Sequence, residues 1–550
     1  MLNPLTPEVV HFSARDGTKL AVAVYKPSQA RELPTLFAAS PYRFDNNALP
    51  ASPQFLWRET GPIDFYVGEG YAYVHLDLRG CGRSEGEFGF LGKDEQGDLY
   101  DAIEWAAAQP WSNGKVGSIG QSYYCMIQWF LGALKPPSLA CIGAHDGAAD
   151  IYRQGCYHGG IPCDFFAGYW WHQNRTINRF PETGPARNQK TDLDSLLAEH
   201  PLFDDFWRER SAWDKLDQIE VPLYSSGVWG KHQLHTRGNI DGYQRARGPK
   251  KLRMSAAPNA WTAAAEFAST DFHRAVMLPF YDRWLKGIET GWESRPAVEF
   301  FVGGSGERRV AAQWPPAETE YQTLYLSPTR SGSVHSFNDG SLASRTSTGV
   351  NSSSYSYPDP GWVAGVVGFG PGGPASGFDP VRRVLTFTTP RLEQDLVIAG
   401  PILLRLYAAS SNADTDFFIK LSDQLDDTDA YKVGHNAAAT VVTRGWLRAS
   451  HRELDPSSTT EVPRHPHDRA DPLIPDQIYP FEISLEPQAY RFAAGHRIRL
   501  EIANGDSPVT EQLWPHMYTP EKIGTDTIFH DSDHPSCLVL PVIPTASDAR

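Results

Sequence analysis

The sequence predicts a two-part protein, in which an α/β domain with an inserted helical cap is followed by a β jelly-roll domain. Strand-like and helix-like segments alternate over about the first 145 residues, the strand signal disappears over residues 150–218, and short strands between turn residues dominate from residue 295 onward. Alternating strands and helices favour a mostly parallel sheet, and closely spaced short strands favour a sandwich or jelly roll. We therefore expect the α/β domain in residues 1–149 and 219–294, the cap in residues 150–218 and the jelly roll in residues 295–550.

The α/β domain begins with six candidate strands and two candidate helices. The clearest helix, residues 94–108, places Leu99, Ile103 and Ala106 on one face, with acidic residues early in the helix where the dipole favours them. A second helix is expected at residues 122–134. The strands are expected at residues 9–14, 20–25, 35–39, 71–77, 116–119 and 139–144.

The remaining elements follow the same reasoning. After the aromatic and charged insertion, strand signals return at residues 221–226 and 251–255, and a long helix is expected around residues 272–285. The jelly-roll strands are expected at residues 298–302, 323–326, 383–388, 403–408, 415–421 and 498–502. Residues 331–377 are rich in Ser, Gly and Pro, which indicates long loops within that domain.

Composition excludes several classes of function. The 550 residues include 50 Lys and Arg against 65 Asp and Glu, which gives a net charge of −15 and argues against nucleic acid or an anionic membrane as partner. No apolar run reaches the length of about 18 residues that a membrane span needs, and the first ten residues do not resemble a secretory signal. The six Cys are scattered and form no CxxC pair, so we expect a reducing cytoplasm.

The strongest chemical signal is the segment KVGSIGQSYYCMIQW, which predicts a strand, a sharp turn and a helix around Gly120 and Ser122. A nucleophile elbow of the form G-x-S-x-G uses such a turn to raise the Ser hydroxyl above the sheet. It also leaves the next backbone N–H at a helix N-terminus, where it can stabilise an oxyanion. The second Gly is Tyr124 here, so the pattern is half present, and an ordinary helix-capping Ser is the alternative.

The sequence resembles the superfamily of cocaine esterase, X-prolyl dipeptidyl aminopeptidase and α-amino acid ester hydrolase. The elbow is similar to the family's G-x-S-Y-x-G, the tripeptide Ser40-Pro41-Tyr42 to its S-P-Y, and residues 77–84 (DLRGCGRS) to its D-x-R-G-x-G-x-S loop. Residues 401–421 and 442–448 look like its C-terminal jelly roll. The resemblance covers nearly the whole chain and implies an α/β-hydrolase core with an inserted helical cap and a C-terminal jelly roll.

The resemblance also implies roles for individual residues. Ser122 would attack an ester or amide carbonyl, and the Tyr123 N–H and the Tyr42 hydroxyl would hold the developing oxyanion. Each such donor contributes about 3–4 kcal/mol of transition-state stabilisation. The alternative for Tyr42 is a core tyrosine with a satisfied hydroxyl.

The acid of the catalytic triad cannot lie where the best-known members of the family place it. They carry an Asp after the strand that follows the cap, whereas this chain reads Gly-Val-Trp-Gly-Lys-His over residues 227–232. The strand at residues 139–144 ends near Asp146, at the sheet edge where catalytic groups gather. We therefore expect Asp146 to be the acid. A capping role for Asp146 and the nearby Asp150 as substitute are the alternatives.

The position expected to hold the catalytic base departs most from the family's pattern. Members that share the Trp-Gly variant typically place a His just before a Trp after the last sheet strand, and Ala260 occupies that slot before Trp261. Either the chain is a natural pseudo-hydrolase, or it carries an engineered His→Ala change, which we favour because the rest of the site is intact. A third option is another histidine as base, with His145, His158, His232 and His235 as candidates.

Other features were weighed for binding. Trp229, at a strand end, and Trp170 and Trp171, in the cap, are expected to line the substrate pocket, with core packing as the alternative for the cap residues. The segment His465-Pro466-His467-Asp468 is interpreted as a solvated turn and not as a metal site, which needs three or four converging ligands. The family implies no cofactor, and we expect no metal.

The sequence thus predicts a serine hydrolase that cleaves an ester or amide of a small apolar or aromatic substrate through an acyl-enzyme. Because of Ala260, activity is expected to be crippled. A non-catalytic binding protein and an aminopeptidase or acylase of the same superfamily are the alternatives. The expected partner is a small-molecule ester or amide, with no nucleic acid and no membrane, and a homo-oligomer stays open.

Overall fold

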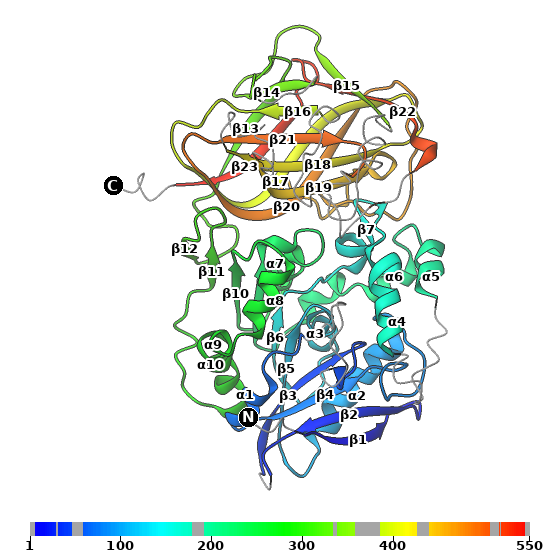
Figure 1. The fold of residues 1–550 in the computed structure, drawn as a ribbon, viewed down its shortest axis with the longest axis vertical. Coiled ribbons are helices and arrows are strands. Elements are labelled where there is room, and N and C mark those ends of the chain that lie inside the picture. Colours follow the sequence, from blue (N-terminus) through cyan, green and yellow to red (C-terminus); the bar gives the residue numbers. More distant parts are fainter. Residues whose placement is uncertain are drawn as a thin grey trace, which may run out of the picture.

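The protein consists of a mixed sheet covered by helices and a closed all-β unit stacked on one end of it (Figure 1). The computed structural model describes residues 6–28, 31–46, 59–178, 192–333, 338–357, 385–425, 439–506, 516 and 519–544. Two large apolar cores correspond to these units, one around the first sheet and one inside the all-β unit.

Over the part of the chain that the structure describes, the first sheet has ten strands in the order β1-β2-β4-β3-β5-β6-β9-β10-β11-β12. All pairs from β4 to β11 are parallel, and the remaining pairs are antiparallel. The first six expected strands are confirmed. The strands are β1 (Glu8–Ser13), β2 (Lys19–Tyr25), β3 (Leu33–Ser40), β4 (Ala72–Asp77), β5 (Ser112–Gln121), β6 (Leu139–His145), β9 (Leu223–Val228), β10 (Lys250–Ser255), β11 (Val298–Phe301) and β12 (Arg308–Ala311).

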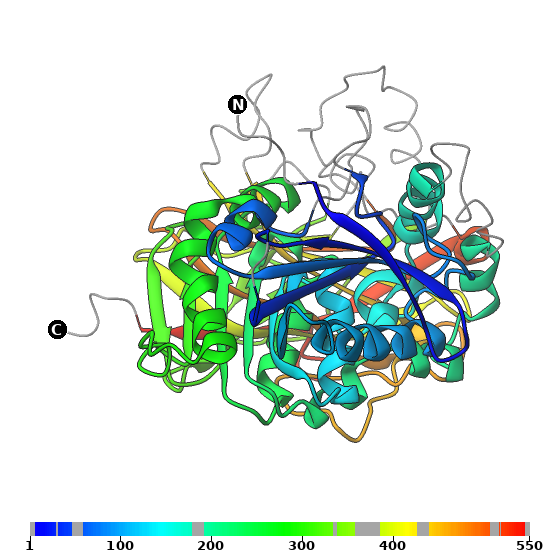
Figure 2. The ribbon, with the colours of Figure 1, turned by 90° about the horizontal axis from the view of Figure 1, so that it is seen from below.

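Helices cover both faces of this sheet (Figure 2). The predicted helix at residues 94–108 is α2 (Lys93–Ala107), and its apolar face of Leu99, Ile103 and Ala106 is buried. The predicted helix at residues 122–134 is α3 (Tyr123–Leu134). The others are α1 (Ile63–Gly68), α7 (Thr236–Arg245), α8 (Ala260–Ala268), α9 (Thr270–Phe272) and α10 (Leu278–Tyr281). π-Helical turns at residues 273–277 and 282–286 join α9 to α10 and continue the helix beyond α10.

One strand expected in the jelly roll joins the first sheet instead. The strand expected at residues 298–302 as the first of the jelly roll is β11, which pairs in parallel with β10 of the first sheet. β12 then pairs with β11, so the first sheet continues to Ala311. The boundary expected at residue 295 stays a prediction, but the strand at residues 298–302 was expected in the wrong sheet, because an apolar strand carries no local signal of which sheet it will join.

The cap is helical as predicted, with one small hairpin added. Its helices are α4 (His172–Asn178), α5 (Leu193–Glu199) and α6 (Asp205–Arg210), with π-helical turns at residues 152–156 and 165–171 and a 3-10 helix at residues 213–218. The hairpin pairs β7 (Tyr157–His158) with β8 (Ile161–Pro162). Its turn docks against the all-β unit, where the Arg448 N–H donates to the Gly159 carbonyl at 2.9 Å (Figure 1).

In the described residues, the C-terminal unit is a single sheet of eleven strands that closes on itself. Its order is β15-β22-β17-β20-β19-β18-β21-β16-β14-β13-β23, and a further pairing of β17 with β23 completes the closure. An all-β unit is thereby confirmed, whereas jelly-roll topology stays a prediction. The strands are β13 (Glu320–Ser327), β14 (Asp339–Ala343), β15 (Ser352–Tyr357), β16 (Leu385–Thr388), β17 (Leu396–Ser410), β18 (Asp416–Gln424), β19 (Ala439–Arg448), β20 (Tyr479–Phe492), β21 (Arg497–Ala503), β22 (Gly524–Phe529) and β23 (Cys537–Ile543).

Three further predictions concern the loop region, the cysteines and membrane-spanning helices. Within the expected loop region 331–377, residues 339–343 and 352–357 are strands, and residues 358–377 lie outside the described part. All six cysteines are free and buried, in line with the expected lack of a disulfide framework. Among the described residues, no helix combines the length and the apolar character needed to cross a membrane.

Candidate active site

Ser122 stands on a strained turn between β5 and α3. Its backbone has φ 62° and ψ −119°, a region that non-glycine residues rarely adopt and that the surrounding structure must enforce. The Ser122 N–H donates to the Asp146 carbonyl at 2.9 Å, and the Met126 N–H returns to the Ser122 carbonyl at 2.9 Å. The expected nucleophile elbow is thus present in geometry although its second Gly is Tyr124.

Gly120 explains how the turn accommodates that tyrosine. A Cβ on Gly120 would lie 2.2 Å from the Cβ of Tyr124, and Gly120 also has φ 140°. Only glycine leaves room for the larger residue. Tyr124, two positions after the nucleophile, therefore fits because the position two before the nucleophile is glycine.

Asp146 lies where the sequence places it, one residue beyond β6. Its side chain is fully buried, and its backbone also has a positive φ, 52°. The Gln121 amide donates to Oδ2 at 2.9 Å, and Lys231 Nζ lies 2.5 Å from the same oxygen. Burial opposes the charged form, but Lys231 and then His235 more than offset it, so the pKa of Asp146 lies below its usual range.

His235 lies between Ser122 and Asp146. Its Nε2 is 3.5 Å from Ser122 Oγ, and its Nδ1 is 3.4 Å from Asp146 Oδ1, an ion-pair contact rather than a formed hydrogen bond. The residue comes from the segment after β9, directly before α7, and is 1% exposed. Burial lowers the pKa of His235 to about 4, with Asp146 raising it and Lys231 lowering it. The imidazole is therefore neutral at pH 7 and able to accept a proton.

Ala260 is placed differently from the expectation. It is the first residue of α8 and is exposed, with Asn259 capping the helix through hydrogen bonds from the Trp261 and Thr262 N–H groups. The histidine that lies against the nucleophile is His235, which comes from the segment after β9 and not from the one after β10. The sequence named His235 only as one of four substitutes. Whether activity is crippled stays a prediction.

Tyr42 and Tyr123 adjoin Ser122 as the resemblance implies. The Tyr42 hydroxyl accepts from Trp170 Nε1 at 3.0 Å, and Ser122 is a second hydrogen-bond partner of this phenol. Burial, followed by the nearby Glu59, raises the pKa of Tyr42 well above its usual range, so its proton stays available for donation. The Tyr123 N–H belongs to the first turn of α3, where no intrahelical acceptor exists.

Two charged residues at the site were missed by sequence reasoning. Glu59 is 4% exposed, forms a hydrogen bond with Ser122, and leaves Oε2 without a partner among the described residues. Burial, with Asp146 adding to it, raises the pKa of Glu59 to about 8. Nothing in the local sequence marks Glu59. Lys231 stands in Gly-Lys-His shortly after β9, at the strand end that faces the site, and its position is the signal that could have found it.

The three tryptophans expected in the pocket separate into different places. Trp170 contacts the site directly, because it hydrogen-bonds Tyr42 and stacks on Tyr123 with ring centroids 6.0 Å apart. Trp171 is fully buried and stacks on Phe88. Trp229 points into the core between the two units, where its Nε1 donates to the Phe301 carbonyl at 2.7 Å. Of the three, only Trp170 is placed to meet a substrate at Ser122.

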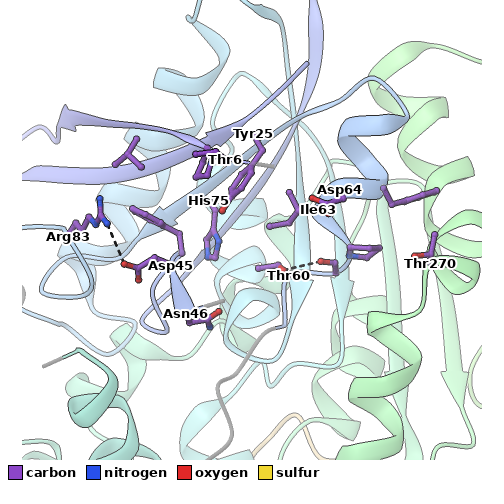
Figure 3. A pocket seen from close by; sticks show the side chains of 16 residues that line it. Thr6, Tyr25, Asp45, Asn46, Thr60, Ile63, Asp64, His75, Arg83 and Thr270 are labelled. Atoms are coloured by element: carbon purple, nitrogen blue, oxygen red, sulfur yellow. Dashed lines mark hydrogen bonds and ion pairs between the residues drawn. The ribbon is translucent and has the colours of Figure 1, made fainter. Parts of the chain in front are cut away.

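A separate cavity of about 880 Å³ lies between β2, β4 and the start of α1 (Figure 3). His75 and Tyr25 form its inner wall, and Asp45 and Arg83 pair at its edge, 3.7 Å apart. None of Ser122, His235 and Asp146 lines it. This cavity is therefore not the pocket in which a substrate would meet Ser122. Thr60 lines the cavity and directly follows Glu59 in the chain.

Comparisons with known proteins agree with this geometry. Residues 16–258 match the model of the X-Pro dipeptidyl-peptidase (S15 family), and residues 290–539 match that of the X-Pro dipeptidyl-peptidase C-terminal non-catalytic domain. The chain is 27% identical to a cocaine esterase from Rhodococcus sp. (strain MB1 Bresler), over 96% of this chain and 97% of that protein. It is 26% identical to a putative serine esterase of Mycobacterium bovis, over 97% and 95% of the two chains.

Solved structures show the same architecture. A CocE/NonD family hydrolase from Staphylococcus aureus superposes with a TM-score of 0.81 at 27% identity, covering 98% of this chain and 93% of that one. An α-amino acid ester hydrolase superposes with a TM-score of 0.72 at 19% identity, covering 97% and 96%, which supports the fold alone. Together, the two matched models, the elbow and its neighbours place the chain in the cocaine-esterase and X-prolyl dipeptidyl-peptidase superfamily of serine hydrolases.

Proposed function

We propose that this chain is a competent serine esterase in which Ser122 is the nucleophile, His235 the general base and Asp146 the acid. The observation that carries the proposal is the position of His235, whose two ring nitrogens face Ser122 Oγ at 3.5 Å and Asp146 Oδ1 at 3.4 Å. Contacts of this length in a ligand-free site are within the range that tightens when substrate binds. This proposal replaces the expectation of an inactive chain.

The reaction follows from the positions of these groups. Ser122 attacks the substrate carbonyl while His235 Nε2 takes its proton, and the Tyr42 hydroxyl and the Tyr123 N–H hold the oxyanion. The imidazolium then protonates the leaving alkoxide, which leaves an acyl group on Ser122. Water activated by the same imidazole releases the acid and restores the serine.

Esters suit this site better than amides. A base whose pKa lies near 4 drives proton removal less strongly than one whose pKa matches neutral pH. Such a base serves best where the carbonyl is reactive and the leaving group departs easily, as in aryl esters. The aromatic surroundings formed by Tyr42, Tyr123 and Trp170 favour an apolar or aromatic substrate.

Glu59 favours a second candidate function, the cleavage of substrates with a free α-amino group. A buried carboxyl beside the nucleophile with one unpaired oxygen can bind an ammonium group, which would also return the carboxyl to its charged form. Paired substrates that differ only in the α-amino group distinguish the two functions. If Glu59 binds the ammonium, Glu59→Gln raises KM for the amino substrate alone.

The deciding experiment compares four variants with an aryl ester panel and a fluorophosphonate probe. Ser122→Ala and His235→Asn should each lower kcat by about 10⁴-fold or more, and Asp146→Asn by somewhat less. Ala260→His should leave activity within about threefold of the parent chain, because position 260 is not the base in this proposal. A large gain in Ala260→His together with an inert parent would contradict the proposal and support an empty base slot. A parent that binds esters without labelling or turnover would support the non-catalytic binding protein.

A further inference from the structure

His158, Cys163 and His516 form a cluster between the cap hairpin and the C-terminal unit, which contains none of Ser122, His235 and Asp146. One ligand-capable atom of each residue lies within 4.8 Å of the others. His158 ends β7, Cys163 directly follows β8, and His516 pairs with Cys163 through an isolated antiparallel bridge. The His158 and Cys163 residues are buried, and the His516 side chain is 1% exposed.

The two imidazoles face each other with their unprotonated nitrogens. His158 Nε2 lies 2.8 Å from the Gln233 carbonyl, which can only accept, so this nitrogen carries the proton and Nδ1 carries the lone pair. His516 Nδ1 lies 3.0 Å from Asp506 Oδ2, which assigns its proton in the same way and leaves the lone pair on Nε2. His158 Nδ1 and His516 Nε2 are nevertheless 2.9 Å apart. Two lone pairs at this distance repel unless a proton or a metal ion lies between them.

The groups around the gap suit a metal ion. The partners on the far side of each ring, a backbone carbonyl and a carboxylate, are the ones that orient metal-bound histidines in known sites. The thiol of Cys163 completes a set of three donors on one side of the gap.

We propose that His158, Cys163 and His516 bind a zinc ion that links the cap hairpin to the C-terminal unit. Two imidazoles and one thiolate are ligands that zinc prefers, and water can fill the fourth tetrahedral position. Ligand nitrogens around a tetrahedral zinc lie about 3.3 Å apart, so the rings need to separate by about 0.4 Å. Burial raises the pKa of the Cys163 thiol, so binding releases a proton to the solvent as the thiolate forms on the metal.

The surroundings are built to hold the cluster rigid. The indole of Trp446 stacks on His158 with centroids 4.6 Å apart, and Phe418 packs edge-on against His516 at 5.1 Å. Because the His158 hydrogen bond ends on Gln233, two residues before His235, the metal also supports the segment that carries the catalytic base. The cluster thus connects three segments that lie far apart in the chain.

The test measures metal in the untagged full-length protein, purified without chelators and dialysed against zinc-buffered solution. Elemental analysis should find about one zinc per chain in the parent and in the control Cys537→Ser, whose cysteine is also free and buried but lies in β23. Cys163→Ser and His516→Gln should lose at least about nine-tenths of that metal. Cobalt in place of zinc should give a thiolate-to-metal absorption band in the parent that disappears in Cys163→Ser.

Stability separates a built site from surface binding. Chelation should lower the Tm of the parent and of Cys537→Ser, and should leave the Tm of Cys163→Ser unchanged, since only the folded site binds the ion. If Cys163→Ser or His516→Gln does not fold, the cobalt absorption band of the parent is compared with that of the variant that does fold. Absence of bound metal in the folded parent would overturn the proposal, as would equal metal content in all four proteins. None of these readouts depends on esterase activity.

Discussion

Lys231 Nζ lies 2.5 Å from Asp146 Oδ2, whereas the imidazole of His235 lies 3.4 Å from the other oxygen of the same carboxylate. The ammonium and the imidazole therefore share one buried anion. Because Lys231 neutralises part of its charge, Asp146 raises the basicity of His235 less than an unshared carboxylate would. This pairing sets the electrostatics of the whole site.

Removing the charge of Lys231 should move the pH profile. The pKa of His235 is lowered to about 4 by burial first, and Lys231 adds to the lowering. Lys231→Met removes that contribution, so the pKa rises and the acid limb of kcat/KM moves to higher pH, because the base must be neutral to act. The measurement is kcat/KM for an aryl ester from pH 3.5 to 8. Lys231→Arg keeps the charge and should retain the parent profile, and an unmoved limb in Lys231→Met would refute the coupling.

Removing the Tyr42 hydroxyl should affect the chemical step and not substrate binding. Tyr42→Phe takes away one oxyanion donor but keeps the ring that packs against Trp170 and Tyr124. We expect kcat to fall by about 10²–10³-fold with KM nearly unchanged. Tyr66→Phe is the matched control, because its buried hydroxyl bonds His273 instead of the site. Equal losses in both variants would indicate a structural role for Tyr42.

Glu59 should make the protein less stable as the pH rises. Its folded pKa, about 8, lies above the ordinary value of 4.5, so the native state holds a proton that the unfolded chain has lost between those pH values. The free energy of unfolding therefore falls from pH 4.5 to pH 8, by roughly 3–5 kcal/mol through this residue alone.

Glu59→Gln removes that dependence. Urea unfolding should show the variant and the parent equally stable within about 1 kcal/mol near pH 4.5, with the variant increasingly more stable toward pH 8. A difference that is independent of pH would show that Glu59 is ionised throughout this range. A difference that shrinks toward pH 8 would have the wrong sign for a buried carboxyl.

A side chain at position 120 should destroy the elbow. In Gly120→Ala the new Cβ would meet the Cβ of Tyr124 at 2.2 Å, so the turn cannot keep its geometry. Gly114→Ala is the control, since Gly114 also has a positive φ, 82°, but no atom within 4 Å of a new Cβ. We expect Gly114→Ala to cost about 1 kcal/mol with full probe labelling, and Gly120→Ala to cost several-fold more and lose labelling of Ser122. Similar effects of both changes would argue against the packing explanation.

The sequence alone determined the parts of the site that depend on neighbours along the chain. The strand, turn and helix around Ser122 are encoded in fifteen consecutive residues, and Asp146 and Tyr42 each follow a strand whose end faces the same sheet edge. The alternation of strands and helices likewise predicted most of the first sheet. These features rest on periodicity and on turn chemistry, which are local.

The tertiary structure decided which histidine meets the serine. Every segment beyond a parallel strand reaches the same edge, so His235 and the residue at position 260 were both candidates, and only the packing of α7 and α8 distinguishes them. Similarly, His465 and His467, expected in a solvated turn, are 7% and 3% exposed because the cap and the C-terminal unit close over them. That expectation was wrong because polar composition does not report what covers a loop.

The remaining features depend on contacts between distant residues. Glu59 has a raised pKa because the folded chain buries it, and Ser122, Lys231 and Asp146 become its neighbours only in that fold. His158 and His516 are separated by 358 positions and meet only where the cap hairpin docks on the C-terminal unit. Local sequence sets which conformations a segment favours, but burial, charge pairing and ligand convergence arise from the assembled fold, because each needs partners that the chain brings together only when it is folded.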